Sequence, residues 1–534
     1  MKLTNLHTTF MVLAFGVCNL ASAQLTIDNA QFTIQSGATV TVQGDVTSNT
    51  DILGAGTLQM NGSAAQNLNM NGFSIPNLEI NNPSNVTLTS ACKVGTSLLF
   101  TNGKILLGTN NFTLADVATI SGQGAGKFVE TNGSGQLLKS LTTNVTLLEL
   151  PVGAGTVYRP AYITTSGTYS NASVGVRLLG ITDPNKPPMI SDFLTTHWPV
   201  TKTGVTGTVT VTGQYADADI SGIENNLRGY YFNGTDWSST GEAHDIALNR
   251  VSAPIATANG DVFGMDKFIL SKTKAFLQAA YNSTTGVMAD NLRTPTNLIP
   301  LSDPYRTAPY STSFTHVSNG VAETASAGVF ADQASSNNNI VDWVFLELRN
   351  NTVSPGNTVL QTRSALLQRN GDIVDVDGTS PVTFNNMTDG NYTLAIRHRN
   401  HIGISADPAT NLKALSETKS TATILDLTTA PDANLFGPAT AYGVATDGKN
   451  ILWAGNANSN ANVRYVGLSN DKDYIVVTTL ANNATQVLSN VYNAADVNMN
   501  RNVRYVGLSN DKDLILVNIL ANTATAQKIQ SLPN

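Results

Sequence analysis

The chain has few cysteines and few charges. Its 534 residues include two cysteines, and only 13% are Asp, Glu, Lys or Arg. Cys18 lies in an N-terminal segment with the pattern of a cleaved signal, so only Cys92 would remain after cleavage and no intramolecular disulfide could form. The chain must therefore be stabilised by burial of apolar side chains in several domains, with or without help from bound cations.

Other absences narrow the function. The net charge of −7 argues against a nucleic-acid partner, which requires a basic surface. No segment after the N-terminus is long and apolar enough to form a transmembrane helix. The sequence has no nucleophile elbow, His-Glu-x-x-His motif, cysteine-rich metal knot or phosphate-binding glycine loop, and no motif marks the carboxylate pair of a glycosidase. We therefore expect no enzymatic activity and assign no catalytic residues.

Residues 1–23 have the features of a secretion signal. Lys2 provides the positive end, residues 10–17 form the apolar stretch, and Ala21-Ser22-Ala23 matches a cleavage site. We expect the mature chain to begin at Gln24 and to be found outside the cell or on its outer surface.

Short alternating apolar pairs fill the sequence from residue 24 to about residue 150. Each pair has the two-residue period of a strand with one buried face, and Asn-Gly or other glycine turns separate the pairs. The pairs are Phe32/Ile34, Val40/Val42, Leu58/Met60, Leu68/Met70, Leu78/Ile80, Val86/Leu88, Leu98/Phe100, Ile105/Leu107 and Phe112/Leu114. This rhythm predicts a right-handed β-solenoid over residues 24–150 with the pairs pointing inward, although a β-sandwich would give a similar spacing.

Residues 151–271 show longer alternating segments and clustered aromatic side chains. The run from Tyr230 to Trp237 is interpreted as one hairpin with its rings in the core, although such rings can also stack on sugars. We predict a β-sandwich-like module here and a second one over residues 272–430. The chain is thus predicted to be an all-β multidomain protein that ends in a small α-helical unit over residues 431–534.

A twelve-residue block near the C-terminus occurs twice without change. Residues 462–473 return as residues 502–513, and each copy follows an Asx-rich run and precedes an apolar stretch. Oxygen side chains at loop positions 1, 3 and 5, with a carboxylate that opens a helix, are how an EF-hand-type loop surrounds a hard cation. The candidate ligands are Asn456, Asn458, Asn460, Asp471 and Asp473 in the first copy, and Asp496, Asn498, Asn500, Asp511 and Asp513 in the second.

The layout of the two copies resembles the tandem dockerin-like tails of bacterial secreted surface proteins. Those tails usually carry Asp-x-Asn-x-Asp-Gly, whereas here Asn456 replaces the first Asp of copy one, and Ala461 and Arg501 replace the glycines. Because fewer carboxylates lower the affinity, we expect weak calcium binding, mainly in the second copy, which keeps Asp496. The alternative is that both loops are cation-free Asx-turns that start helices.

Residues 272–430 resemble a module found in the same surface proteins, whose members are described as hemagglutinin-like or dockerin-bearing. The matching segments are residues 274–278, 288–293, 342–349 and 396–401. With the tail, the resemblance covers roughly half of the chain, and it implies a class of surface protein without naming a ligand.

Two histidines in this module are candidate metal ligands. His398 and His401 would lie on opposite faces of a strand, so we expect them not to share a metal. Arg397 and Arg399 beside them would repel a cation, and we expect these side chains to pair with nearby carboxylates such as Glu347 or with main-chain carbonyls.

The sequence therefore predicts a secreted cell-surface adhesin or structural protein that acts by attachment through its β modules. Its partners would be host or environmental glycans or surface proteins. One alternative is a carbohydrate-binding or scaffold component that docks through its tail onto a cohesin-like partner, which exposed aromatic rows would favour. Another is a β-solenoid enzyme that degrades polysaccharides, which a solenoid cleft with two or three carboxylates would favour.

Overall fold

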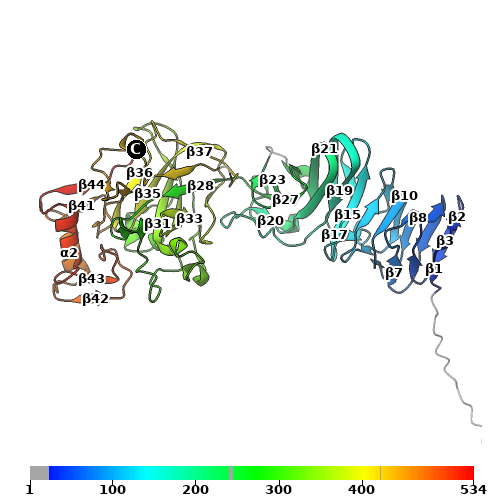
Figure 1. The fold of residues 1–534 in the computed structure, drawn as a ribbon, viewed down its shortest axis with the longest axis horizontal. Helices are drawn as coiled ribbons and strands as arrows, with labels where there is room; N and C mark the ends of the chain where they lie inside the picture. The colour runs from blue at the N-terminus through cyan, green and yellow to red at the C-terminus, as the bar shows by residue number, and fades with distance from the viewer. Residues whose placement is uncertain (1–22, 240–243, 421) are drawn as a thin grey trace, which may run out of the picture. The chain divides into compact units, whose positions relative to one another are not determined.

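The protein consists mainly of short strands (Figure 1). Strands make up 42% of the computed structural model, and its described residues include two short α-helices. The described residues are 23–239, 244–420 and 422–534. They form two compact units, of which the first comprises the described residues up to 181 with 196–216 and 248–262, and the second comprises the rest. The predicted secretion signal lies outside the described residues, apart from Ala23.

The N-terminal part is a β-solenoid of about six turns, as predicted. One face is an eight-stranded sheet whose strands pair in parallel, except for the last antiparallel pair. Its strands are β1 (Leu25–Ile27), β4 (Val46–Ser48), β7 (Gln66–Asn69), β9 (Val86–Leu88), β11 (Ile105–Leu106), β14 (Val129–Glu130), β17 (Val152–Ala154) and β18 (Val157–Tyr158).

A second parallel stack forms another face of the solenoid. It contains β3 (Thr39–Val42), β6 (Thr57–Met60), β8 (Ser74–Asn81), β10 (Cys92–Asn102), β12 (Phe112–Leu114), β13 (Thr119–Ser121) and β15 (Leu137–Leu141). A short parallel pair joins β2 (Phe32–Ile34) to β5 (Ile52–Gly54). In-register parallel pairing places equivalent side chains above one another, so each apolar pair continues the column of the previous turn.

The predicted apolar pairs line the interior of the solenoid. Leu58, Leu68, Leu78 and Leu98 are each at most 1% exposed, which confirms that they point inward. Phe32 and Val40 are only half-buried. Phe32 lies in β2, which pairs only with β5, and Val40 lies in β3, which pairs only with β6 among the described residues. Each side chain therefore has a neighbouring turn on one side.

Parallel stacking ends where long antiparallel strands begin. β19 (Ala161–Val176) pairs antiparallel with β15 and with β16 (Leu148–Leu150), and then with β21 (Trp198–Gln214). β21 continues the sheet to β26 (Arg250–Pro254). The remaining strands of this region are β20 (Phe193–Leu194), β22 (Ile220–Ser221), β23 (Leu227–Phe232), β24 (Trp237–Ser238), β25 (His244–Asp245) and β27 (Asn259–Asp266). β23 and β24 form the predicted hairpin, and Tyr230, Tyr231 and Trp237 are buried as expected.

The second unit contains a nine-stranded sheet in which all pairings are antiparallel except β28 with β38. Its strands are β28 (Phe268–Lys274), β31 (Ile340–Arg349), β32 (Val359–Gln368), β33 (Asp372–Val374), β34 (Val382–Asn385), β35 (Gly390–His398), β36 (His401–Ser405), β37 (Lys413–Leu415) and β38 (Ile424–Asp426). Two small pairs accompany it, β29 (Tyr281–Asn282) with β30 (Val287–Met288) and β39 (Gly443–Val444) with β40 (Asn450–Ile451).

The tail forms two similar halves around an apolar core that also includes Ile402 of β36. Each half has a short strand, a three-residue α-helix, a π-helical continuation and a second short strand. The first half contains β41 (Asn462–Arg464), α1 (Asp471–Asp473), η9 (Tyr474–Thr479) and β42 (Val487–Ser489), and the second contains β43 (Asn502–Arg504), α2 (Asp511–Asp513), η10 (Leu514–Ile519) and β44 (Gln527–Ile529). β41 pairs with β44, and β42 pairs with β43.

Cys92 is a free, buried cysteine in β10. Burial raises the pKa of its thiol, so the side chain acts as a small apolar group of the solenoid core. Among the described residues, no helix combines the length and apolarity needed to span a membrane.

Two adjacent leucines of β10 provide a test of the solenoid core. Leu98→Ala should lower the free energy of unfolding by about 2–5 kcal/mol, because Leu98 is fully buried and its truncation leaves a cavity. Leu99→Ala is the matched control, since Leu99 is 38% exposed, and it should cost less than about 1 kcal/mol. Urea unfolding of the two variants measures the difference. Equal losses of unfolding free energy in the two variants would contradict the inward orientation of Leu98.

Candidate functional site: the C-terminal repeat loops

The start of each short helix is fixed by an asparagine cap. The Asn470 side chain accepts the main-chain N–H of Asp473 at 2.8 Å, and Asn510 accepts that of Asp513 at 2.8 Å. Asp473 and Asp513 thus lie in the first helical turns, where negative charge is favourable. Their side chains are 51% and 52% exposed and pair with Lys472 and Lys512. Asp473 and Asp513 are thus fixed in position by the helix caps, and their carboxylates face solvent.

Asp471 and Asp511 have a different role, because both are fully buried. Asp471 accepts the main-chain N–H of Arg464 at 2.8 Å, and Asp511 accepts those of Arg504 at 2.8 Å and Val497 at 2.9 Å. Each carboxylate therefore ties its loop to its helix. Burial raises the pKa of Asp471 to about 7. Burial, and then the charge of Asp496, raise the pKa of Asp511 well above its usual value.

The two loops differ at their first position. In the second loop, the Asp496 carboxylate accepts the N–H groups of Asn500 and Arg501, each at 2.9 Å, and burial raises its pKa to about 6. In the first loop, Asn456 donates its amide to the carbonyl of Asn460 at 2.5 Å. Asn456 Oδ1 is buried and has no hydrogen-bond partner among the described residues. The first loop therefore keeps an unsatisfied oxygen where the second has a carboxylate.

The asparagines at positions 3 and 5 close both loops as Asx-turns. Asn498 Oδ1 accepts the N–H of Asn500 at 3.1 Å, and Asn500 Oδ1 accepts that of Asn502 at 2.9 Å. Asn498 also donates its amide to the carbonyl of Ser509 at 2.9 Å, and Asn458 and Asn460 make the equivalent bonds in the first loop. The loops are thus stable as turns, while each oxygen retains a second lone pair for ligation.

Calcium fits the donor set of the second loop better than that of the first. Asp496 and Asp511 are hard oxygen donors, burial raises the pKa of both, and the charge of Asp496 raises the pKa of Asp511 further. A cation would relieve this cost of ionisation. The first loop offers Asp471 and the unsatisfied Asn456 oxygen. If bound, the cation would supply charge neutralisation and would rigidify the loop, with Asn498 and Asn500 as further oxygen donors.

Arg501 occupies the loop position where a glycine is usual. Its φ is +77°, a conformation that costs an L-residue on the order of 1–2 kcal/mol. Its guanidinium donates to the carbonyls of Asn291, at 3.0 Å, and Thr294, and to Asn490 Oδ1 at 3.2 Å. These bonds tie the second loop to the preceding module, which offsets the backbone strain.

Both loops contact the same turn of the neighbouring sheet, the one formed by Arg399 and Asn400 between β35 and β36. Asn400 donates its amide to the carbonyl of Asp496 at 2.7 Å and accepts the N–H of Asn456 at 3.1 Å through its own carbonyl. The carbonyl of Arg399 accepts the hydroxyl of Ser459 at 2.5 Å. The tail is therefore packed against residues of its own chain at the loops themselves.

A buried ion pair supports this turn. Arg399 Nε donates to Asp342 Oδ2 at 3.0 Å, and both side chains are fully buried. Arg399 also donates to the carbonyl of Asn493 at 2.5 Å, and its guanidinium lies 4.3 Å from the Tyr492 ring centre. The Tyr492 hydroxyl donates to Asp342 Oδ1 at 2.6 Å. One carboxylate of the sheet thus holds both the turn and the tail.

The expectation that His398 and His401 face opposite sides of one strand is wrong. A two-residue turn separates them, so they end β35 and begin β36 as paired residues, and their Nδ1 atoms lie 3.1 Å apart. His398 Nε2 contacts Asp342 Oδ2 at 3.0 Å. Burial lowers the pKa of both imidazoles, which favours the neutral forms. The expected pairing of an arginine with Glu347 is confirmed, because Arg397 lies 3.2 Å from it.

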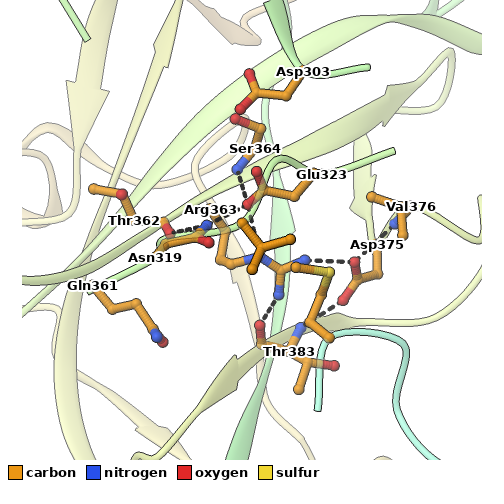
Figure 2. A network of polar contacts seen from close by, with 12 residues as sticks. Asp303, Asn319, Glu323, Gln361, Thr362, Arg363, Ser364, Asp375, Val376 and Thr383 are labelled. Atoms are coloured by element: carbon orange, nitrogen blue, oxygen red, sulfur yellow. Dashed lines mark hydrogen bonds and ion pairs between the residues drawn. The ribbon is translucent and has the colours of Figure 1, made fainter. Parts of the chain in front are cut away.

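A second polar network surrounds Arg363 of β32, a strand of the nine-stranded sheet (Figure 2). Figure 2 shows Arg363 between Glu323 and Asp375, which it contacts at 3.1 and 2.7 Å. Asp303 and Glu323 also contact Arg306, at 3.2 and 3.4 Å.

One group in this network has the residue types of a metal site. Asp303, His316 and Glu323 each offer a ligand atom within 4.8 Å of the others. The two guanidiniums of Arg306 and Arg363 already supply positive charge to these carboxylates. The network is therefore interpreted as a buried ion-pair cluster of the sheet, in which arginines occupy the place of a cation.

The middle of each repeated block carries an exposed apolar tip. Leu468 is 88% exposed and Leu508 is 87% exposed, and Val466 and Val506 are each close to half exposed. These four residues, called the twin tips below, have no role in the tail core among the described contacts. The sequence signal for these exposed residues is the exact repetition of the block. Core packing alone does not require the same exposed leucine in both copies.

Comparison with protein-family models, curated proteins and solved structures finds no match for this chain.

Calcium should stabilise the tail, mainly through the second loop. With calcium in tenfold excess over a millimolar dissociation constant, selective binding to the folded form would add about 1.4 kcal/mol of stability. Asp496→Ala should remove most of the resulting rise in melting temperature, and Asn456→Ala should remove little. Differential scanning calorimetry of the chain with calcium or with a chelator measures both effects. A tail transition that ignores millimolar calcium would contradict the prediction.

The pH dependence of the calcium effect tests whether calcium binds at Asp496. The pKa of Asp496 is raised on folding, so its contribution to the stability of the cation-free chain is present at low pH and is lost as the pH rises through about 6. Calcium needs the ionised carboxylate. Its stabilising effect should therefore be larger at pH 7.5 than at pH 5, and an effect that grows on acidification would indicate binding elsewhere.

Proposed function

We propose that this protein is a secreted cell-surface adhesin or structural protein that acts by attachment, without covalent chemistry. The observation that carries the proposal is the joining of a β-solenoid, with polar side chains between its buried positions, to a tail that presents apolar tips with no packing role. Solenoids offer long, regular surfaces for contact with a partner. An exposed leucine that serves no core is typical of a surface that contacts another molecule.

The proposal includes the finer architecture predicted from the sequence. The modules over residues 151–271 and 272–430 would be β-sandwich-like, and the tail would be a dockerin-like unit of the hemagglutinin-like class. The paired loops with capped helices support the dockerin-like assignment. The ligand would be a glycan or a protein on a host or environmental surface.

Attachment can be separated from hydrolysis in one experiment. The purified chain should bind erythrocytes or polysaccharide particles in a sedimentation assay and should release no reducing sugar from cellulose, chitin, xylan or laminarin. A release of reducing sugar that a single Asp or Glu substitution abolishes would overturn the non-enzymatic proposal. Failure to bind any cell or particle would overturn the attachment proposal.

The twin tips favour a second candidate function, docking of the tail onto a cohesin-like partner. The face of the tail that carries its loops is occupied by Arg399 and Asn400 of the same chain, whereas Leu468 and Leu508 are free of packing among the described residues. A partner would therefore contact the tips. Burial of such exposed leucines provides a favourable free energy of association.

The docking candidate predicts a specific loss of binding. Leu468→Ser combined with Leu508→Ser should abolish binding to a panel of purified cohesin modules, measured by surface plasmon resonance, and should leave the melting temperature unchanged. Val477→Ser with Val517→Ser is the control, because these valines are also nearly half exposed but lie on the helical segments. No binding by the unmodified chain would argue against this function and leave attachment as the proposal.

A further inference from the structure

The first unit contains a groove whose lining combines aromatic rings with planar polar groups. The groove has a volume of about 450 Å³ and lies where β16, β18, β19 and β21 end or begin. Its lining includes three tyrosines and one carboxylate. Together with Arg159, the polar and aromatic lining residues are Gln123, Glu149, Tyr158, Tyr162, Gln214 and Tyr215. A smaller hollow of about 90 Å³ adjoins it through Gln123 and Glu149.

The position of the groove follows from strand pairing. Glu149 of β16 is directly opposite Tyr162 of β19, and Gln214 of β21 is opposite Arg250 of β26. Because β19 also pairs with β21, these outward side chains form a row across four strands. A rigid antiparallel sheet therefore holds the row in place.

Two tyrosine rings are fixed from one side. The Arg250 guanidinium lies 3.9 Å from the Tyr162 ring centre, and the Tyr158 ring stacks on Phe128 with centres 5.6 Å apart. Both tyrosines remain half-buried and line the groove. Ordering these rings before a ligand arrives lowers the entropic cost of binding. Such rings present negative faces to the polarised C–H groups of a ligand.

The polar groups are arranged to exchange hydrogen bonds. Tyr162 donates to Gln214 Oε1 at 2.8 Å, and Tyr158 donates to Glu149. Burial, and then the hydrogen bond to Glu149, raise the pKa of Tyr158, so this phenol stays protonated. Gln123 Oε1 is buried and has no hydrogen-bond partner among the described residues. An unsatisfied buried acceptor is costly, and a hydroxyl donor from a ligand would satisfy it.

We propose that this groove binds a short segment of an uncharged oligosaccharide. A sugar ring has an apolar C–H face for Tyr162, and its hydroxyl groups can donate to Gln123 Oε1 and to the phenol oxygens, whose own O–H groups are already used within the groove. The lining carries the charges of Glu149 and Arg159 with opposite sign, which suits a neutral ligand. This inference rests on the proposed attachment function and gives it a location and a ligand class.

The same lining favours binding over cleavage. Hydrolysis of a glycosidic bond uses two carboxylates on either side of the bond. Among the groove residues that the structure describes, Glu149 is the one carboxylate, and it already accepts the Tyr158 hydroxyl. The solenoid enzyme considered from the sequence would need a second carboxylate at this position.

The test uses cellohexaose, laminarihexaose, mannohexaose and chitohexaose with the purified chain in isothermal titration calorimetry. At least one should bind, and Tyr162→Ala should weaken that binding by at least about tenfold, the factor equivalent to about 1.4 kcal/mol. Tyr169→Ala is the matched control, because Tyr169 lies on the same strand, away from the groove, and its hydroxyl bonds to Asn144. It should leave the affinity unchanged.

A second variant guards against misfolding of the first. Gln123→Leu keeps the side-chain size and removes the unsatisfied acceptor, so it should weaken binding several-fold without lowering the melting temperature. The groove is ruled out as a glycan site if none of the four oligosaccharides binds, or if Tyr162→Ala and Gln123→Leu bind as tightly as the unmodified chain. Attachment to erythrocytes that persists in that case keeps the attachment function and places its contact outside this groove. Oligosaccharide binding without particle attachment supports the groove and overturns the attachment function.

Discussion

The ion pair between Asp342 and Arg399 is the contact on which the second unit depends. Both groups are fully buried, so each charge needs the other, and removal of either would leave an uncompensated charge in the core. Asp342 belongs to β31, an inner strand between β32 and β35, while Arg399 is part of the turn that both tail loops contact. The pair also fixes Tyr492, which lies between the two repeats in sequence. A single buried carboxylate thus connects the sheet, its turn and the tail.

Because the tail is bonded to the sheet in this way, the repeat loops do not need a cation in order to form. Their sequence suggests an autonomous cation-binding module, but their main-chain groups are bonded to Asn400 and their second loop is anchored through Arg501. Helix capping and Asx-turns satisfy most of the loop oxygens without an ion. A bound cation would therefore adjust a structure that is already formed. This differs from small metal modules whose folding requires the ion.

Local features of the fold could be predicted from the sequence, and contacts between distant segments could not. The period of two in pairs such as Leu78/Ile80 identifies the solenoid because the same face must be buried in every turn. His398 and His401 were misplaced because a two-residue turn looks like continuous strand in a short polar run. The Asp342 partner of Arg399 is 57 positions away, and nothing in either segment marks the pairing. The groove likewise gathers Gln123, Glu149 and Gln214 from separate strands and loops.

The strand pairing of the tail closes it into a ring. The strand of the first repeat, β41, pairs with β44 at the far end of the second repeat, while β42 and β43 join the two repeats in the middle. Every strand of one repeat therefore pairs with a strand of the other repeat. The copy number is therefore set at two by connectivity: loss of one repeat would leave the other with an unpaired edge, and a third repeat could be accommodated only by opening the ring.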